Sequence, residues 1–179
     1  MAEIKMNTPI RQAKIMAYVE APKILDRCVL QDYPAGLIDW RPDLEGAWTI
    51  REHLVHVADA DVLAFARFGY AIAESGLSLT NWDKEGWCQT LSYCQQSATV
   101  ALQLIRLLRS MVAGRLKGLS PEQWDRAGCI HPVRGAMSLD DLVDLYTKHI
   151  GMHDEMIRRN EKLWQEASPA ERGRAQACR

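Results

Sequence analysis

The sequence lacks a long apolar run, because every hydrophobic stretch is interrupted by Arg, Asp or Gln within a few residues. A membrane-spanning helix needs roughly 20 consecutive apolar residues, so we expect no membrane span. An export signal is also missing: the segment Met1 to Met6 carries a lysine but no apolar region and no cleavage site of small residues. We therefore expect a cytoplasmic protein.

No charge sign dominates either, since 22 Lys and Arg against 23 Asp and Glu give a formal net charge of -1. This balance gives no reason to expect nucleic acid or an anionic membrane as a partner. Cysteine pairs are absent as well: the five cysteines are an odd number without a CxxC motif. That pattern argues against a disulfide scaffold or a thiolate zinc site, and we expect free thiols.

The composition is that of an ordinary globular protein, with 47% hydrophobic and 25% charged residues in 179. Strand-like alternation flanked by hairpin turns is hard to find, and almost every segment has a helical period. We predict an all-α fold in a single domain, 1–179, with an ordered core from about 9 to 166. The tail, 168–179, has little to bury and is expected to be frayed.

Four long amphipathic helices follow from the spacing of the apolar residues. The expected ranges are 9–30, a helix that opens at Thr49 with an apolar stripe to Phe68, 88–116 and 139–165, with a short helix from Pro121 before the last. The stretches 32–47 and 75–87 are rich in polar residues, proline or glycine, and they give long connections after the first two helices. Because each helix must bury its apolar stripe, we expect a four-helix bundle.

The last predicted helix carries His149 and His153, four residues apart. At that spacing two side chains point in directions about 40° apart and one turn from each other, so both imidazoles can bind one metal ion. With five histidines in the chain, such a pair arises by chance in on the order of one shuffled sequence in seven. The pair also lies beside the apolar stripe of its helix, so it faces the bundle interior from the side.

A third ligand is expected from the second helix, which carries His53 and His56. Metal sites in bundles are built from side chains on facing helices. The helical wheel slightly favours His53, which lies nearer the apolar stripe, but it does not decide between the two.

Two stretches of the chain form a recognisable pattern: WTIREHLVHVADAD, from Trp48 to Asp61, and GAMSLDDLVDLYTKHIGMH, from Gly135 to His153. In these stretches the chain resembles the DinB-like family. The resemblance extends over about 15–164 and rests on the order and spacing of the motifs as well as on single residues.

The resemblance implies a ligand set. In the family a tryptophan opens the second helix, a metal-binding histidine follows eight residues later, and two more histidines form an HxxxH motif on the fourth helix. These positions are Trp48, His56, His149 and His153 in this chain. We therefore predict metal binding by His56, His149 and His153, with His53 as the alternative to His56.

Three imidazoles without a fourth protein ligand form an open site, where a metal ion can activate bound water or a bound thiol. The family includes thiol-dependent S-transferases, so the resemblance implies a thiol S-transferase or a metal-dependent hydrolase acting on a small electrophilic substrate. A low-molecular-weight thiol is the expected co-substrate, and zinc or nickel the expected ion, with iron, manganese and copper as alternatives. The family's tendency to pair implies a homodimer. The competing hypothesis is a non-catalytic, stress-related metal-binding bundle.

Four other side chains have functional groups that are relevant to this site. Asp61 interrupts an apolar stripe, and it either assists a ligand imidazole, acts as a base or pairs with an arginine. Tyr146 lies one turn before His149 and either donates to the substrate or packs in the core. His131 is expected in a loop, either near the site or in solvent. No acid or histidine is fixed beside Cys88, so cysteine catalysis is not expected.

Overall fold

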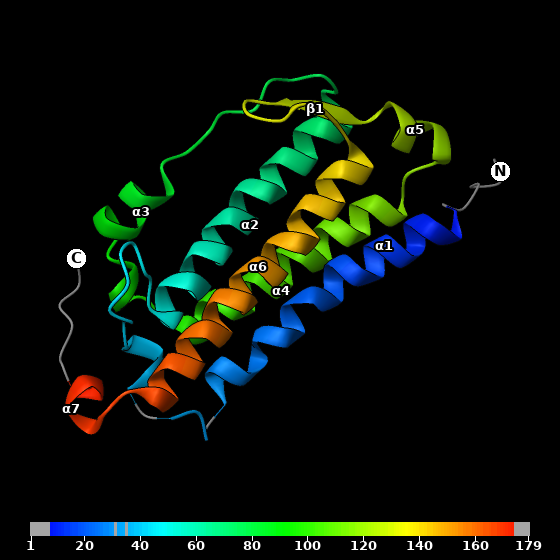
Figure 1. Cartoon of the computed structure of the whole chain (residues 1–179). Coiled ribbons are helices and arrows are strands. Elements are labelled where there is room, and N and C mark those ends of the chain that lie inside the picture. Colours follow the sequence, from blue (N-terminus) through cyan, green and yellow to red (C-terminus); the bar gives the residue numbers. More distant parts are fainter. Residues whose placement is uncertain (1–7, 31, 35, 174–179) are drawn as a thin grey trace.

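The computed structural model describes residues 8–30, 32–34 and 36–173, and it confirms the predicted all-α four-helix bundle. The four long helices run side by side (Figure 1). They are α1 (Pro9–Glu20), α2 (Ile50–Ala73), α4 (Ala98–Lys117) and α6 (Leu139–Glu166). Helices α1 and α2 occupy opposite corners, because each packs against both α4 and α6. The histidine-bearing helices α2 and α6 are therefore neighbours.

The predicted helix starts are confirmed by their capping interactions. At the start of α2, the Thr49 hydroxyl accepts from the Glu52 N–H, and the Glu52 carboxylate accepts from the Thr49 N–H. These reciprocal bonds satisfy backbone donors that the first helical turn leaves free. Equivalent boxes open α5 (Pro121–Arg126), with Ser120 and Gln123, and α6, with Ser138 and Asp141.

The first predicted helix, 9–30, is α-helical only to Glu20, and a 3₁₀ helix, η1 (Ala21–Val29), continues it. Pro22 explains the change, because proline has no N–H to donate and its ring collides with the carbonyl four residues earlier. The connection to α2 contains a second short 3₁₀ helix, η2 (Leu37–Asp39).

The prediction of one unbroken helix over 88–116 is wrong. The chain forms α3 (Lys84–Thr90), a 3₁₀ turn η3 (Tyr93–Gln95) and then α4. Ser92 adopts a left-handed conformation with φ of 50°, and the Ser97 hydroxyl accepts from the Val100 N–H to begin α4. Serine side chains compete for backbone hydrogen bonds and so favour helix ends over helix interiors. The apolar spacing that continues through this segment concealed the break.

The sequence showed no clear strand pattern, but the all-α bundle carries one short hairpin. Strands β1 (Gly128–His131) and β2 (Gly135–Ser138) form an antiparallel hairpin at one end of the bundle (Figure 1). The segment after α2 joins it, since the Leu79 N–H donates to the Ile130 carbonyl and the Ile130 N–H to the Leu77 carbonyl. Strands of four residues are too short to show a clear alternating pattern.

The predicted frayed tail begins with a further helix, α7 (Pro169–Arg172), capped by Ser168, and the rest of that tail lies outside the described residues. Cys28, Cys88 and Cys129 are buried free thiols, but Cys94 is disulfide-bonded, so the expectation of free thiols fails at that position. Among the described helices, none is both long and apolar enough to cross a membrane.

Two apolar clusters make up the core, and a polar layer lies between them. One cluster, at the hairpin end, contains Phe68 of α2 and Val112 of α4, and the other contains Leu54 and Ile105 of the same helices. Between these positions α2 places Asp61 and α4 places Arg109, both completely buried. The candidate site lies beside this layer, on the α2 and α6 side of the bundle.

Candidate metal centre

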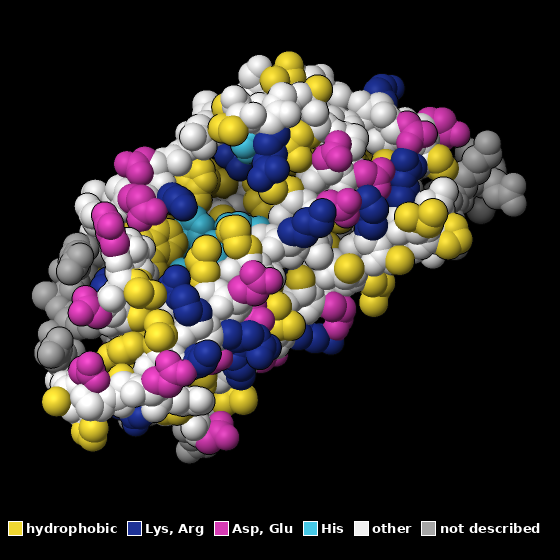
Figure 2. Space-filling view, viewed as in Figure 1, with side chains coloured by type: hydrophobic (Ala, Val, Ile, Leu, Met, Phe, Trp, Pro, Cys, Tyr) yellow, Lys and Arg dark blue, Asp and Glu magenta, His cyan; other side chains and the backbone are white. Residues whose placement is uncertain are grey.

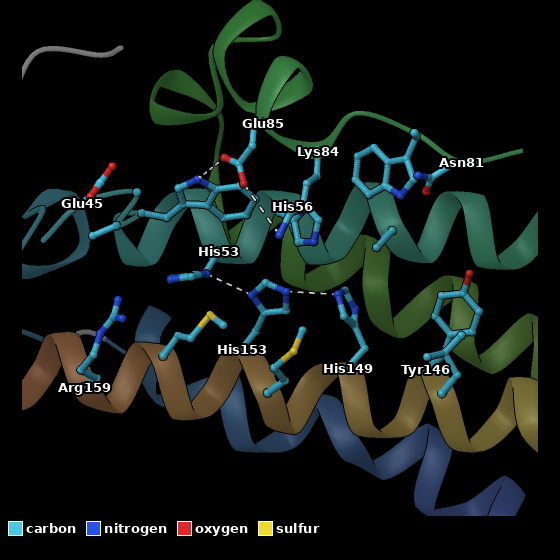
Figure 3. A pocket seen from close by; sticks show the side chains of 18 of the residues that line it. Glu45, His53, His56, Asn81, Lys84, Glu85, Tyr146, His149, His153 and Arg159 are labelled. Carbon is cyan, nitrogen blue, oxygen red and sulfur yellow. Dashed lines mark hydrogen bonds and ion pairs between the residues drawn. The ribbon is translucent and has the colours of Figure 1, made fainter. Parts of the chain in front are cut away.

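Three imidazoles from two helices meet in one place. His56 of α2 and the pair His149 and His153 of α6 each offer a ring nitrogen, and the three nitrogens lie within 4.8 Å of one another. The Nε2 atoms of His149 and His153 are 3.1 Å apart. Among the described residues, these three form the one group of His, Cys, Asp or Glu side chains that converges in this way. Figure 3 shows them between the two helices.

The donor set fits a divalent cation. Tetrahedral ligands with bonds of about 2.0 to 2.1 Å stand about 3.3 Å apart, close to the separation of the two Nε2 atoms of α6. The Nδ1 atoms of His56 and His149 are buried and have no hydrogen-bond partner among the described residues. Burial lowers the pKa of His56 to about 3 and that of His149 to about 4. Both rings are therefore neutral near pH 7, which is the form that binds metal.

His53 lies next to this group but outside it. Its Nδ1 is 3.0 Å from Nδ1 of His153, and the other ring nitrogen of His153 is the one that faces His149 (Figure 3). The structure thus groups His56, and not His53, with the α6 pair. One of the two Nδ1 atoms donates to the other, so this contact with His53 restrains the orientation of the His153 ring.

Two tryptophans, Trp48 and Trp82, cover the histidines, and the sequence analysis assigned no role at the site to Trp82. Trp82 stacks on His56 with ring centroids 5.1 Å apart and an interplanar angle of 7°. Trp48, which the family pattern includes, lies 4.9 Å from the His56 ring. Trp87 supports Trp82 edge-on at 4.7 Å. The available signal was a polar connection containing two tryptophans without an evident partner.

The histidines form the floor of a cavity of about 510 Å³ between α2, α6 and the segment that leads into α3. Figure 2 shows histidine side chains at the bottom of a hollow, with Lys and Arg side chains around its edge. The charged residues that line it are Glu45, Arg67, Lys84, Glu85 and Arg159. Of the two glutamates, Glu85 accepts a hydrogen bond from Trp48 Nε1 at 3.0 Å.

Asp61 forms an ion pair with Arg109. Its carboxylate is bound by Arg109, whose Nε and Nη2 donate to it at 2.6 and 3.0 Å. Arg109 also donates to the backbone carbonyls of Tyr18 and Tyr146. Asp61 is therefore the arginine-paired carboxylate of the alternative interpretation, and it joins the helices rather than orienting an imidazole.

Of the remaining candidate residues, Tyr146 lines the cavity and His131 and Cys88 do not. Tyr146 lines the cavity, and its hydroxyl accepts from Arg67 Nη1 at 2.8 Å, although its ring also packs against Phe68. His131 lies outside the cavity lining and accepts from backbone N–H groups within the hairpin turn. Cys88 is buried away from the cavity, and burial raises the pKa of its thiol to about 12.

The fold and the site define a helical bundle with a three-histidine candidate metal centre between neighbouring helices. A model of the DinB superfamily matches residues 20–157. The chain belongs to the DinB superfamily, as its motifs predicted.

Curated relatives and one solved structure agree with this assignment. A protein of Oceanobacillus iheyensis named "putative metal-dependent hydrolase" is 30% identical over 108 residues, which span 60% of this chain and 61% of that protein. One of the same name from Geobacillus thermodenitrificans is 28% identical over 84% of both chains. The structure of YfiT from Bacillus subtilis, described as "a probable metal-dependent hydrolase with an unusual four-helix bundle topology", matches with a TM-score of 0.78. That match covers 92% of this chain and 93% of the other at 21% identity, and it shows a common fold.

Proposed function

We propose that this protein is a metal-dependent enzyme that binds one divalent ion through His56, His149 and His153 and acts on a small electrophilic substrate. The observation that carries the proposal is the convergence of three neutral imidazoles on the floor of a cavity of about 510 Å³. A cavity of this size accommodates a small molecule. The relatives named as putative metal-dependent hydrolases support the same class of reaction.

Zinc or nickel is the preferred ion, since both suit imidazole ligands, and iron, manganese and copper are the alternatives. Bound by three histidines with an open position, such an ion lowers the pKa of a thiol or of water and supplies a nucleophile near neutral pH. A low-molecular-weight thiol as nucleophile gives S-transfer, and water gives hydrolysis.

The chain's own side chains complete this proposal. His53 holds the His153 ring through the Nδ1 contact. Trp48 and Trp82 pack against His56 and limit the access of bulk water to the histidines. Lys84, with its ammonium 5.9 Å from the Trp48 ring, adds positive charge at the rim. An electrostatic environment of this kind favours a thiolate over a thiol.

The second candidate function is a non-catalytic, stress-related metal-binding bundle. The burial of His56, only 3% exposed, favours it, because an ion held there would tie α2 to α6 as a structural link. The cavity above the histidines favours the enzyme, since a purely structural site is normally closed.

Removal of the metal by a chelator distinguishes the two candidate functions, because an enzyme loses turnover whereas a non-catalytic bundle loses only stability. The metal-loaded protein is incubated with cysteine or 2-mercaptoethanol and 1-chloro-2,4-dinitrobenzene, and separately with 4-nitrophenyl acetate. We expect turnover in one of these assays that chelation abolishes, that added metal restores and that the His149→Ala/His153→Ala variant lacks. A chelator that lowers the melting temperature while no assay shows metal-dependent turnover would support the non-catalytic bundle.

A further inference from the structure

One arginine in the cavity wall differs from four other half-buried or buried arginines among the described residues. Those that join the helices are neutralised by carboxylates: Arg27 by Asp154 and Glu161, Arg41 by Glu52, Arg51 by Asp39 and Arg109 by Asp61. Arg67, which is half-buried and lines the cavity, forms no ion pair with a described carboxylate. Its Nη1 donates to the Tyr146 hydroxyl and its Nη2 to the Thr80 carbonyl, each at 2.8 Å.

Both acceptors are neutral, so neither of them offsets the positive charge of the guanidinium. A guanidinium has five N–H groups, and these two bonds leave three of them for a ligand. The two neutral acceptors also fix the plane of the group. A fixed guanidinium plane suits two parallel hydrogen bonds to a carboxylate or a phosphate.

Arg67 stands at a definite place relative to the histidines. It follows His56 by eleven residues on α2, which places it on the same helix face within about 20° and roughly 16 Å further along the axis. Its side chain leans back toward the N-terminus of the helix and so toward His56. Ala60, a small residue between the two, lines the cavity and leaves the path open.

The other charges of the cavity lie elsewhere. Figure 3 shows Tyr146, the partner of Arg67, at one end of the row of histidines, and Glu45 and Arg159 at the opposite end. Glu85 is bound to Trp48 and lies 3.7 Å from the Lys84 ammonium. Asn81, whose side-chain amide can also donate a hydrogen bond, lines the Tyr146 end. Among the described residues that line the cavity, the Arg67 end therefore carries positive charge and no carboxylate.

We propose that the cavity selects an elongated anionic small molecule, with its reactive group at the histidines and its carboxylate or phosphate bound by Arg67. The histidine end of this inference rests on the function proposed above. Arg67 is thus a specificity-determining residue, and it also ties α2 to α6 through Tyr146 and to the loop at Thr80. A purely structural Arg67 would affect charged and uncharged ligands equally.

The test uses cobalt-loaded protein and ω-mercapto carboxylates of increasing chain length, each paired with its uncharged methyl ester. Thiolate-to-cobalt absorption gives the dissociation constant of each probe. At the best chain length we expect the acid to bind about tenfold more tightly than its ester. The ratio of the dissociation constants of ester and acid should fall to about one in Arg67→Gln and should remain partly above one in Arg67→Lys. Arg159→Gln, which removes the same charge from the opposite end, is the matched control and should retain it.

A second arm separates this inference from the metal proposal. Hexanoate, hexyl phosphate and methyl hexanoate are titrated into chelator-treated protein, with the fluorescence of the cavity tryptophans as the signal. A preference for either anion that Arg67→Gln removes supports the inference even if no thiol binds cobalt, and the stronger anion identifies the group. If the mercapto carboxylates and their methyl esters bind cobalt with equal dissociation constants, the metal proposal stands and the role of Arg67 is overturned. Equal binding of anion and ester in both arms, or a preference that survives Arg67→Gln, overturns it as well.

Discussion

Two buried polar clusters lie side by side in this bundle, and they are satisfied to different degrees. In the first, Arg109 donates four hydrogen bonds, two to Asp61 and two to the backbone carbonyls of Tyr18 and Tyr146. In the second, the histidine cluster, three buried ring nitrogens have no hydrogen-bond partner in the part of the chain that the structure describes: Nε2 of His53 and Nδ1 of His56 and His149. An unpaired buried polar group costs about 1 to 3 kcal/mol.

The difference in hydrogen bonding indicates which cluster is structural and which one binds a ligand. A saturated cluster, in which each polar atom has a hydrogen-bond partner, stabilises the fold and needs no ligand. An unsaturated cluster lowers the stability of the fold, and its presence indicates a binding partner. The two are also connected, because the Tyr146 carbonyl that accepts from Arg109 lies one turn before His149 on α6. The structural cluster therefore sets the position of the helix that carries two of the proposed ligands.

Breaking the saturated cluster should have the largest effect. Asp61→Ala leaves the buried Arg109 charge without a partner, and we expect the free energy of unfolding to fall by about 3 to 5 kcal/mol. Urea unfolding of the metal-free protein measures this loss. The double variant Asp61→Leu/Arg109→Met, which removes both charges, should recover most of it. A loss below about 1 kcal/mol in Asp61→Ala would mean that the ion pair does not hold the helices together.

Filling the unsaturated cluster should have the next largest effect. Zinc at about 100 times its dissociation constant should raise the free energy of unfolding of the wild type by about 2.7 kcal/mol. His149→Ala/His153→Ala should show no zinc-dependent shift in the same urea titrations. His131→Ala, which alters a histidine outside the cavity lining, is the matched control and should shift as the wild type does. Equal shifts in all three proteins would place the zinc elsewhere.

The smallest effect is expected from the residue that connects the ligand set to its surroundings. His53→Leu removes the partner of His153 Nδ1, and loss of such a supporting bond weakens metal binding by about tenfold or more. His53→Asn, whose amide can take the place of Nδ1, should retain most of the affinity. Competition with a chromogenic chelator measures both constants. If Leu and Asn weaken binding equally, His53 acts through packing and not through its hydrogen bond.

The sequence predicted features that depend on local interactions. The capping boxes at Thr49 and Ser138 placed the starts of α2 and α6 correctly, because the bonds involved join residues only three apart. The HxxxH spacing likewise put His149 and His153 on one helix face. The break at Ser92 was missed, since a left-handed residue between two apolar segments leaves no trace in the hydrophobic period.

Features that depend on how helices are rotated against each other could not be predicted from the residues alone. His53 and His56 are both almost completely buried, at 2% and 3% exposed, so a wheel that sorts inside from outside does not distinguish them. Only the position of α6 shows which imidazole meets His149. Asp61 and Arg109 are 48 residues apart, and no local pattern pairs them.

The central claim is that His56 completes a metal site with the α6 pair. It is tested most directly by calorimetric titration of chelator-treated protein with zinc, comparing the wild type with His56→Ala. We predict one ion per chain in the wild type, and an affinity at least about a hundredfold lower in His56→Ala, because one of three ligands is lost. Wild-type protein that binds no stoichiometric ion, or His56→Ala protein that binds zinc as the wild type does, would contradict the account.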